Sequence, residues 1–129
     1  MIVVDASALI AIATGEPDAS LYAKALEQSD TAYLSSPNYL ETGLILVRRG
    51  IASGSRDVEV WLNEAGVSIR ADLPLAADAL DAYLRFGKGF HPARLNLGDC
   101  FAYALAKALD APLLYKGDDF ALTDVRSAL

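Results

Sequence analysis

The stretch MIVVD, residues 1–5, decides the fold, because it is a short β-branched run that ends in an acid. The stretch PLLYKGDDF, residues 112–120, has the same pattern, with an apolar run followed by a glycine and two acids. β-Branched residues favour strands. In open parallel sheets, ligands bind outside the carboxyl ends of the strands. We therefore expect both runs to direct acids, Asp5 and the pair Asp118-Asp119, toward one edge of a sheet.

Strand-like and helix-like segments alternate between these two runs. Strands are expected at 2–5, 31–34, 67–70 and 112–115, and Val125 fits a last short strand. Helices are expected at 6–13, from the cap Asp18 to 28, from the cap Ser36 to a stop at Gly50, and at 55–65, 74–86 and 97–109. Such alternation favours parallel pairing. The sequence therefore predicts an α/β fold, a three-layer α/β/α arrangement with a central, mostly parallel sheet, in a single domain over residues 1–129.

Length and composition indicate the size of the core and the cellular compartment that we expect for the protein. A chain of 129 residues can bury a sizeable core without staples. The single cysteine, Cys100, rules out an internal disulfide and fits a reducing compartment. No cation precedes Lys24, as a signal peptide would require, and the uncharged stretch at residues 6–15 is far shorter than the roughly 20 residues of a membrane span. We expect a soluble cytoplasmic protein with no membrane segment.

The formal net charge of −6 argues against a nucleic-acid partner, but the distribution of charge matters more than its total. Two windows, between Glu41 and Asp57 and between Asp81 and Asp99, contain no acid. The first holds Arg48, Arg49 and Arg56, and the second holds Arg85, Lys88 and Arg94. These cations could follow an RNA backbone. The plainer interpretation is that they are ordinary solvated cations.

Glu41 is the most informative acid. In a helix it shares a face with Leu44 and Ile45. A carboxylate on an apolar stripe costs several kcal/mol unless it is paired or coordinated. Arg48 and Arg49 lie two turns away, so a partner must come from elsewhere in the fold. The alternative is that Glu41 lies at the edge of the stripe and reaches water.

The other acids have structural explanations beside the functional one. Asp99 is the third helical residue if Asn96 is the cap, so it can close a capping box. Asp5 can cap the helix that follows it, and Asp118-Asp119 can be a polar turn. Ser7, two residues beyond Asp5, fits a helix cap or a group that steers a metal-bound water.

The residue types and motifs that this sequence lacks exclude several classes of catalytic site. His91 is the only histidine, so RNA cleavage by two histidines through the 2′-hydroxyl is excluded. No zinc-type Cys/His set, GxxxxGK phosphate loop or GxSxG elbow is present. A ligand set made only of oxygens suits Mg²⁺, or Mn²⁺ as a substitute. Cys100 is most simply a small buried residue.

Four segments in order resemble PIN-domain ribonucleases, specifically the VapC toxins of type II toxin–antitoxin pairs. They are MIVVDASALIAI (1–12), SSPNYLETGLIL (35–46), LNLGDCFAYALA (95–106) and LLYKGDDFALTDV (113–125). Asp-x-Ser alone would be weak, but GDCFAYALA and KGDDF are specific, and the resemblance covers essentially the whole chain.

The resemblance implies a site and a reaction. Asp5 and Asp99 match the family's main metal ligands, Glu41 matches its helix glutamate, and Asp118 is the expected fourth acid, with Asp119 as the alternative. Many relatives have a small hydroxyl residue in this segment, where this chain has Tyr115-Lys116. The family cleaves RNA, here expected to be a tRNA or rRNA loop, with Mg²⁺-assisted attack by water. A homodimer inhibited by a cognate VapB-type antitoxin is its usual arrangement.

Two other functions are compatible with parts of the sequence. A phosphoacceptor such as a receiver domain is also α/β, and Lys116 could serve as its lysine, but neither 31–34 nor 67–70 ends in the required aspartate. A degenerate PIN domain that only binds RNA or a partner is the other alternative.

Overall fold

The computed structural model of residues 1–129 has one central sheet of four parallel strands in the order β3-β2-β1-β4. The strands are β1 (Ile2–Val4), β2 (Ala32–Ser35), β3 (Val67–Arg70) and β4 (Leu113–Leu114). The helices are α1 (Ala6–Ala13), α2 (Ala19–Glu27), α3 (Ser36–Arg48), α4 (Ser55–Glu64), α5 (Ala76–Phe86) and α6 (Leu97–Ala108), with a 3₁₀ helix η1 (Phe120–Leu122). Because β1 pairs with both β2 and β4, Asp5 follows an inner strand.

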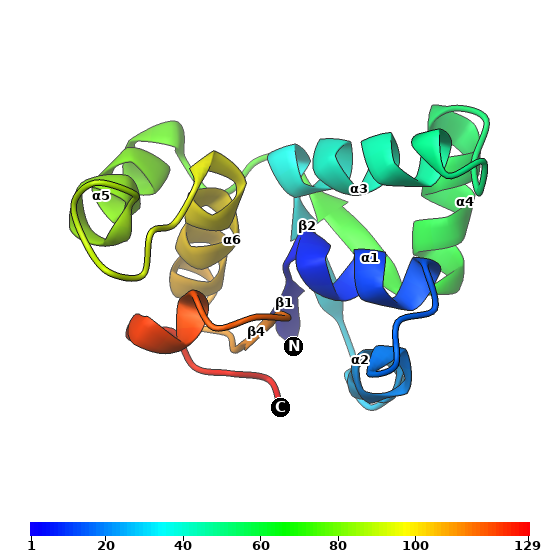
Figure 1. Cartoon of the computed structure of the whole chain (residues 1–129), viewed down its shortest axis with the longest axis horizontal. Helices are drawn as coiled ribbons and strands as arrows, with labels where there is room; N and C mark the ends of the chain where they lie inside the picture. Colours follow the sequence, from blue (N-terminus) through cyan, green and yellow to red (C-terminus); the bar gives the residue numbers. More distant parts are fainter.

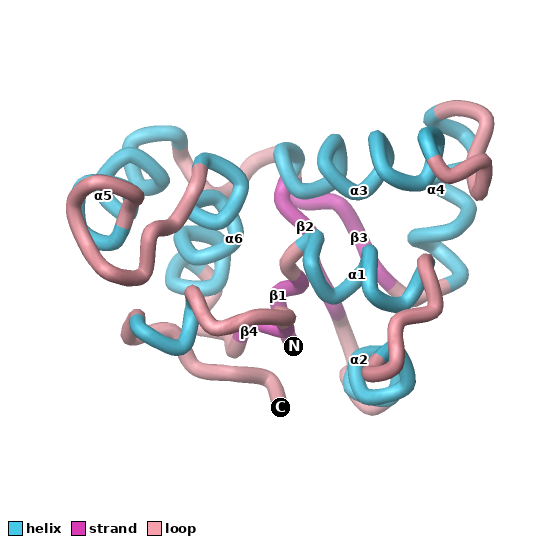
Figure 2. The backbone as a smooth tube through the Cα atoms, in the orientation of Figure 1, coloured by secondary structure: helices cyan, strands magenta, loops and turns pink.

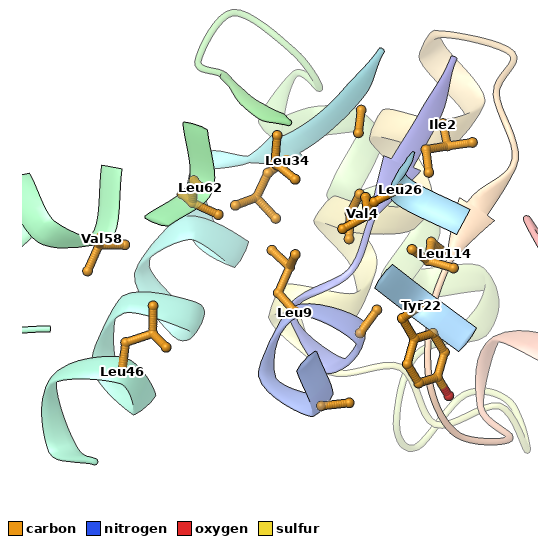
Figure 3. Close-up of a cluster of buried hydrophobic side chains, with 14 of the residues drawn as sticks. Ile2, Val4, Leu9, Tyr22, Leu26, Leu34, Leu46, Val58, Leu62 and Leu114 are labelled. Carbon is orange, nitrogen blue, oxygen red and sulfur yellow. The ribbon is translucent and has the colours of Figure 1, made fainter. Parts of the chain in front are cut away.

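Helices cover both faces of the sheet (Figure 1). On one face, α1 to α4 pack on the strand residues Ile2, Val4, Leu34 and Leu114. Figure 3 shows the helix residues Leu9, Leu46 and Leu62 of the same cluster. On the other face, α6 packs on Val3 and Leu113, and α5 packs against α6 (Figure 1). Strand residues alternate between the two cores, as the two-residue period of a strand requires. The predicted three-layer α/β/α fold with a parallel sheet is confirmed.

Local capping chemistry sets the helix starts. Ser35, not Ser36, caps α3, because the Ser35 Oγ accepts a hydrogen bond from the Asn38 N–H at 3.3 Å. Gly50 takes φ = 71° just beyond the end of that helix, as its predicted role as a stop requires. Helix α5 begins at Ala76 rather than Pro74, since Leu75 is still extended.

The structure corrects the prediction for Val125 and refines that for Asp18. Asp18 does occupy the N-cap position of α2. The side chain of Asp18 makes no capping hydrogen bond to α2; it accepts instead from Lys116 Nζ and from the Tyr22 hydroxyl, both at 3.0 Å. Val125 is in no strand, and the last pairing is an isolated bridge between Leu113 and Ser127. In both places a contact with a distant segment overrides the local pattern.

None of the helices combines the length and the apolar character that a membrane crossing would need.

Candidate metal centre

Asp5 lies at the carboxyl end of β1, where it caps α1. Its Oδ2 accepts the Ser7 N–H at 3.0 Å, and the residue is only 4% exposed. Burial raises the pKa of Asp5 to about 6; the hydrogen bonds from Ser7 oppose this rise, and the charge of Glu41 adds to it. Asp5 is therefore a helix cap and also a buried carboxylate close enough to Glu41 to feel its charge.

Glu41 lies on α3 between the core face and the solvent face. The fully buried residues of α3 are Asn38, Thr42 and Leu46, whereas Leu44 is 49% exposed. The predicted apolar stripe under Glu41 is therefore not the core face. Its hydrogen-bond partner also differs from the expectation, because Asn38, one turn earlier on the same helix, donates from Nδ2 to Glu41 Oε1 at 3.0 Å. Burial raises the pKa of Glu41, the Asn38 bond lowers it, and the charge of Asp99 raises it further.

Asp99 closes a capping box at the start of α6. Its N–H donates to the Asn96 Oδ1 at 2.9 Å, and its Oδ2 accepts the Asn96 N–H at 3.0 Å. The structural explanation offered by the sequence is thus confirmed. Burial nevertheless raises the pKa of Asp99 to about 6; the Asn96 bond opposes the rise, while the charges of Asp5 and Asp119 add to it. Asp99 therefore caps α6 and interacts with the other acids at the same time.

The turn after β4 carries the remaining acids. Asp118 and Asp119 are both exposed, and Asp119 immediately precedes η1. Asp119 contributes to the raised pKa of Asp99, and Asp118 has no such relation. The electrostatics therefore favour Asp119, the alternative, over Asp118 as the fourth member of the group.

The acids form a group through their charges rather than through direct contact. As the side chains stand, no three of the His, Cys, Asp and Glu residues lie close enough together to enclose a metal ion. Each of the three inner acids is turned toward a hydrogen-bond donor of its own. None of the five carboxylates forms an ion pair, since all six pairs in the structure use other acids. Asp5 is buried and Glu41 and Asp99 are partly buried. Carboxylates in such surroundings, with raised pKa values and no cationic partner, form a site that a divalent cation would stabilise.

The three predicted RNA-contacting cations do not lie in equivalent places. Lys88 and Arg94 belong to the loop between α5 and α6, drawn in pink in Figure 2, and neither forms an ion pair. Arg85 is on α5, where its guanidinium lies 4.7 Å from the Phe86 ring centre and 3.5 Å from an Asp124 carboxylate oxygen. Arg85 is therefore already engaged within the protein.

Sequence reasoning missed two residues of the site, Asn38 and Gly98. Asn38 Nδ2 donates to the Gly98 carbonyl at 3.1 Å as well as to Glu41, which joins the first turns of α3 and α6. The signal was available in the sequence: an amide one turn before a glutamate, and a glycine beside an aspartate. Neither had a meaning until the two helices were seen to meet.

Cys100 is buried beside Asp99, and burial raises the pKa of its thiol to about 11. The thiol is therefore not poised as a nucleophile.

An all-parallel sheet with acids beyond the end of the inner strand β1 is an α/β fold with a candidate metal site. Comparisons with known proteins agree with this description. The PIN domain family model matches residues 2–125. Ribonuclease VapC of Mycolicibacterium smegmatis is 48% identical over 124 residues, covering 95% of this chain and 96% of that protein. Ribonuclease VapC42 of Mycobacterium tuberculosis is 45% identical over 128 residues, covering 98% of each.

A solved structure matches the fold at lower identity. The crystal structure of Mycobacterium tuberculosis VapC20, described as a sarcin–ricin-loop-cleaving toxin, superposes with a TM-score of 0.66 at 19% identity, covering 98% of this chain and 99% of that one. The family model and the two VapC relatives show that the chain belongs to the PIN-domain family and, within it, to the VapC proteins.

Proposed function

We propose that this protein is a metal-dependent endoribonuclease toxin that hydrolyses phosphodiester bonds in RNA. The observation that carries the proposal is the group of Asp5, Glu41 and Asp99, which are buried to differing degrees, have raised pKa values and lack any cationic partner. Their position beyond the carboxyl end of a parallel sheet is where α/β folds bind ligands. The similarity to proteins named VapC ribonucleases supports the same activity.

The donor set fits Mg²⁺, with Mn²⁺ as a substitute, because it consists only of carboxylates. Asp5, Glu41, Asp99 and one acid of the Asp118-Asp119 pair would hold the ion. Once bound, the ion supplies the activation of water and the stabilisation of the departing 3′-oxygen. With a single histidine in the chain, the protein has no two-histidine acid–base pair, so attack by water rather than by the 2′-hydroxyl is expected.

The residues of this chain would bind and orient the RNA. Lys88 and Arg94 are free to contact phosphates, whereas Arg85 would first have to leave Asp124. We propose a tRNA or rRNA loop as substrate, because single-stranded loops can splay their bases toward a recessed site. VapC20, which shares the fold, is described as cleaving such a loop.

The partners follow the VapC pattern. We propose inhibition by a cognate VapB-type antitoxin in the cytoplasm, and assembly as a homodimer. An exposed apolar face supports the dimer: Leu80 and Leu97 are more than half exposed and line a pocket of about 550 Å³ between α5 and α6. Contiguous apolar surface of this kind is typical of interaction sites. Sedimentation of Leu97→Asp beside the parent tests this assignment, because a parent that sediments as a monomer would contradict it.

The central test is RNA cleavage by purified, antitoxin-free protein. Cleavage should require Mg²⁺ or Mn²⁺ and leave 3′-hydroxyl and 5′-phosphate ends. Cleavage that survives excess chelator, or products with 2′,3′-cyclic phosphates, would refute the metal mechanism.

A binding module without catalysis is the second candidate. It is favoured by one observation, that no three acids enclose a metal ion as the side chains stand. RNA binding without any cleavage in Mg²⁺ and Mn²⁺ would identify it.

The receiver-type alternative would need Lys116 as its site lysine. Lys116 is instead paired with Glu16 at 3.2 Å and with Asp18 at 3.0 Å.

A further inference from the structure

Asn38 is a fully buried side chain whose amide uses both of its N–H donors and one of the two acceptor positions of its oxygen. Its Oδ1 accepts from the Ser35 hydroxyl at 2.7 Å, and its Nδ2 donates to Glu41 Oε1 at 3.0 Å and to the Gly98 carbonyl at 3.1 Å. The orientation of the amide is determined by these partners. A flipped amide would set its oxygen against a carboxylate and a carbonyl, which are both acceptors.

Gly98 forms the opposite wall of the same small space. A Cβ added at Gly98 would collide with Glu41 Oε1 and would lie 2.9 Å from Oε2. The φ of Gly98 does not require glycine, because only positive-φ positions do so and Gly98 is not among them. Glycine is therefore needed here for space, and the space is filled by the Glu41 carboxylate.

We propose that Asn38 and Gly98 form a seat for the Glu41 carboxylate, in which Asn38 is a positioning residue and Gly98 supplies the room. The seat spans the two helix starts that carry Glu41 and Asp99, which face each other in Figure 1. It sets the position of Glu41 relative to Asp99. The role of the seat in metal binding rests on the proposed function, whereas its geometry does not.

A purely structural role is the competing explanation, because a buried amide that joins two helices also stabilises the core. Thr42 provides the matched control for Asn38. It is equally buried on the same face of α3, and its hydroxyl donates to the Asn38 carbonyl at 2.8 Å, with no hydrogen bond to the Glu41 carboxylate. Gly43 provides the control for Gly98, since a Cβ there would make only ordinary contacts of 3.7 Å with Val58.

The first experiment measures urea unfolding in chelator. Gly98→Ala should destabilise the parent but be neutral or stabilising in a Glu41→Ala background, because removal of the carboxylate opens the space and alanine is the better helix former. Gly43→Ala should behave alike in both backgrounds. An unchanged cost of Gly98→Ala in the Glu41→Ala background would overturn the seat.

The second experiment measures Mn²⁺ affinity by calorimetry without RNA. Asn38→Ala should weaken binding by about 10- to 100-fold, the usual effect of losing a group that orients a ligand. It should cause no further loss in a Glu41→Ala background, and Thr42→Val should bind like the parent. Additive losses, or an equal loss in Thr42→Val, would overturn the positioning role. A parent that binds no Mn²⁺ would refute the proposed function instead, and the seat would then be decided by the unfolding experiment alone.

Discussion

The backbone N–H of Lys116 donates a hydrogen bond to the Ser7 hydroxyl at 3.0 Å, which joins the turn after β4 to the first turn of α1. Ser7 also donates its own N–H to Asp5. The Lys116 ammonium pairs with Glu16 and Asp18, in the connection between α1 and α2. The turn that carries Asp118 and Asp119 is thus anchored on the segment that follows Asp5.

Replacing Lys116 with Met should reduce stability only slightly, because its ion pairs are partly exposed and screened by salt. The cleavage rate should fall clearly, since the turn with Asp119 loses the ion pairs that help to anchor it. Thermal melts at low and high salt, together with cleavage rates, would check both parts. A variant that cleaves at the parental rate would show that the backbone bond to Ser7 suffices.

Asp99→Asn should melt at the same temperature as the parent or higher when both are in chelator at neutral pH. Burial raises the folded-state pKa of Asp99 to about 6, above the 3.8 of the unfolded chain. The stability that Asp99 contributes is therefore complete below pH 3.8 and is lost as the pH rises through about 6. Asparagine removes the charge but keeps an acceptor for the Asn96 N–H. Melting across pH 4 to 8 measures the difference, which should vanish at the acidic end.

The stability that Asp5 contributes should also be lost as the pH rises, because its folded-state pKa is raised as well. The parent in chelator should therefore be less stable at neutral pH than at mildly acidic pH. Its pKa of about 6 lies roughly two units above the unfolded value, which corresponds to about 3 kcal/mol lost between pH 4 and neutral pH. Added Mg²⁺ should restore about 2.7 kcal/mol at a hundredfold excess over Kd in the parent.

Asp99→Asn should gain little stability from Mg²⁺ and should cleave no RNA. If it instead melts well below the parent in chelator, the carboxylate is chiefly a cap.

Asp119→Asn should reduce cleavage and Mn²⁺ affinity more than Asp118→Asn does. The reason is that Asp119, but not Asp118, contributes to the raised pKa of Asp99. Both residues are exposed, so neither change should alter stability strongly. The two variants control for each other in one calorimetric series. A larger loss in Asp118→Asn would restore the assignment made from the sequence.

Lys88→Ala and Arg94→Ala should each weaken RNA binding and lower the slope of log affinity against log salt by about one. Arg85→Ala should change the slope less, because Arg85 is already paired with Asp124. Binding titrations in Mg²⁺-free buffer over a range of salt separate the three. Arg126, paired with Asp110 away from the loop, provides a control cation. Equal slopes for all four variants would return these residues to a solvated surface.

The sequence by itself determined the layer order, the parallel sheet and the acids at its edge. Each depends on short-range information: a β-branched run at 2–4, an apolar run at 113–114, helix caps such as Asn96, and stops such as Gly50. It also predicted that Asp99 would close a capping box, because that contact spans only three residues.

Tertiary structure alone decided which side chains meet. The face of α3 was misjudged because Leu44 is apolar yet exposed, while the buried Asn38 is polar. Asp18 does occupy the N-cap position of α2, but its carboxylate binds Lys116, 98 residues away, instead of the helix. The seat of Glu41 needs Asn38 and Gly98 to meet across 60 residues. Hydrophobic periodicity identifies a buried face only where burial is apolar, and here the contact between two helix starts is made by an amide, a backbone carbonyl and a missing Cβ.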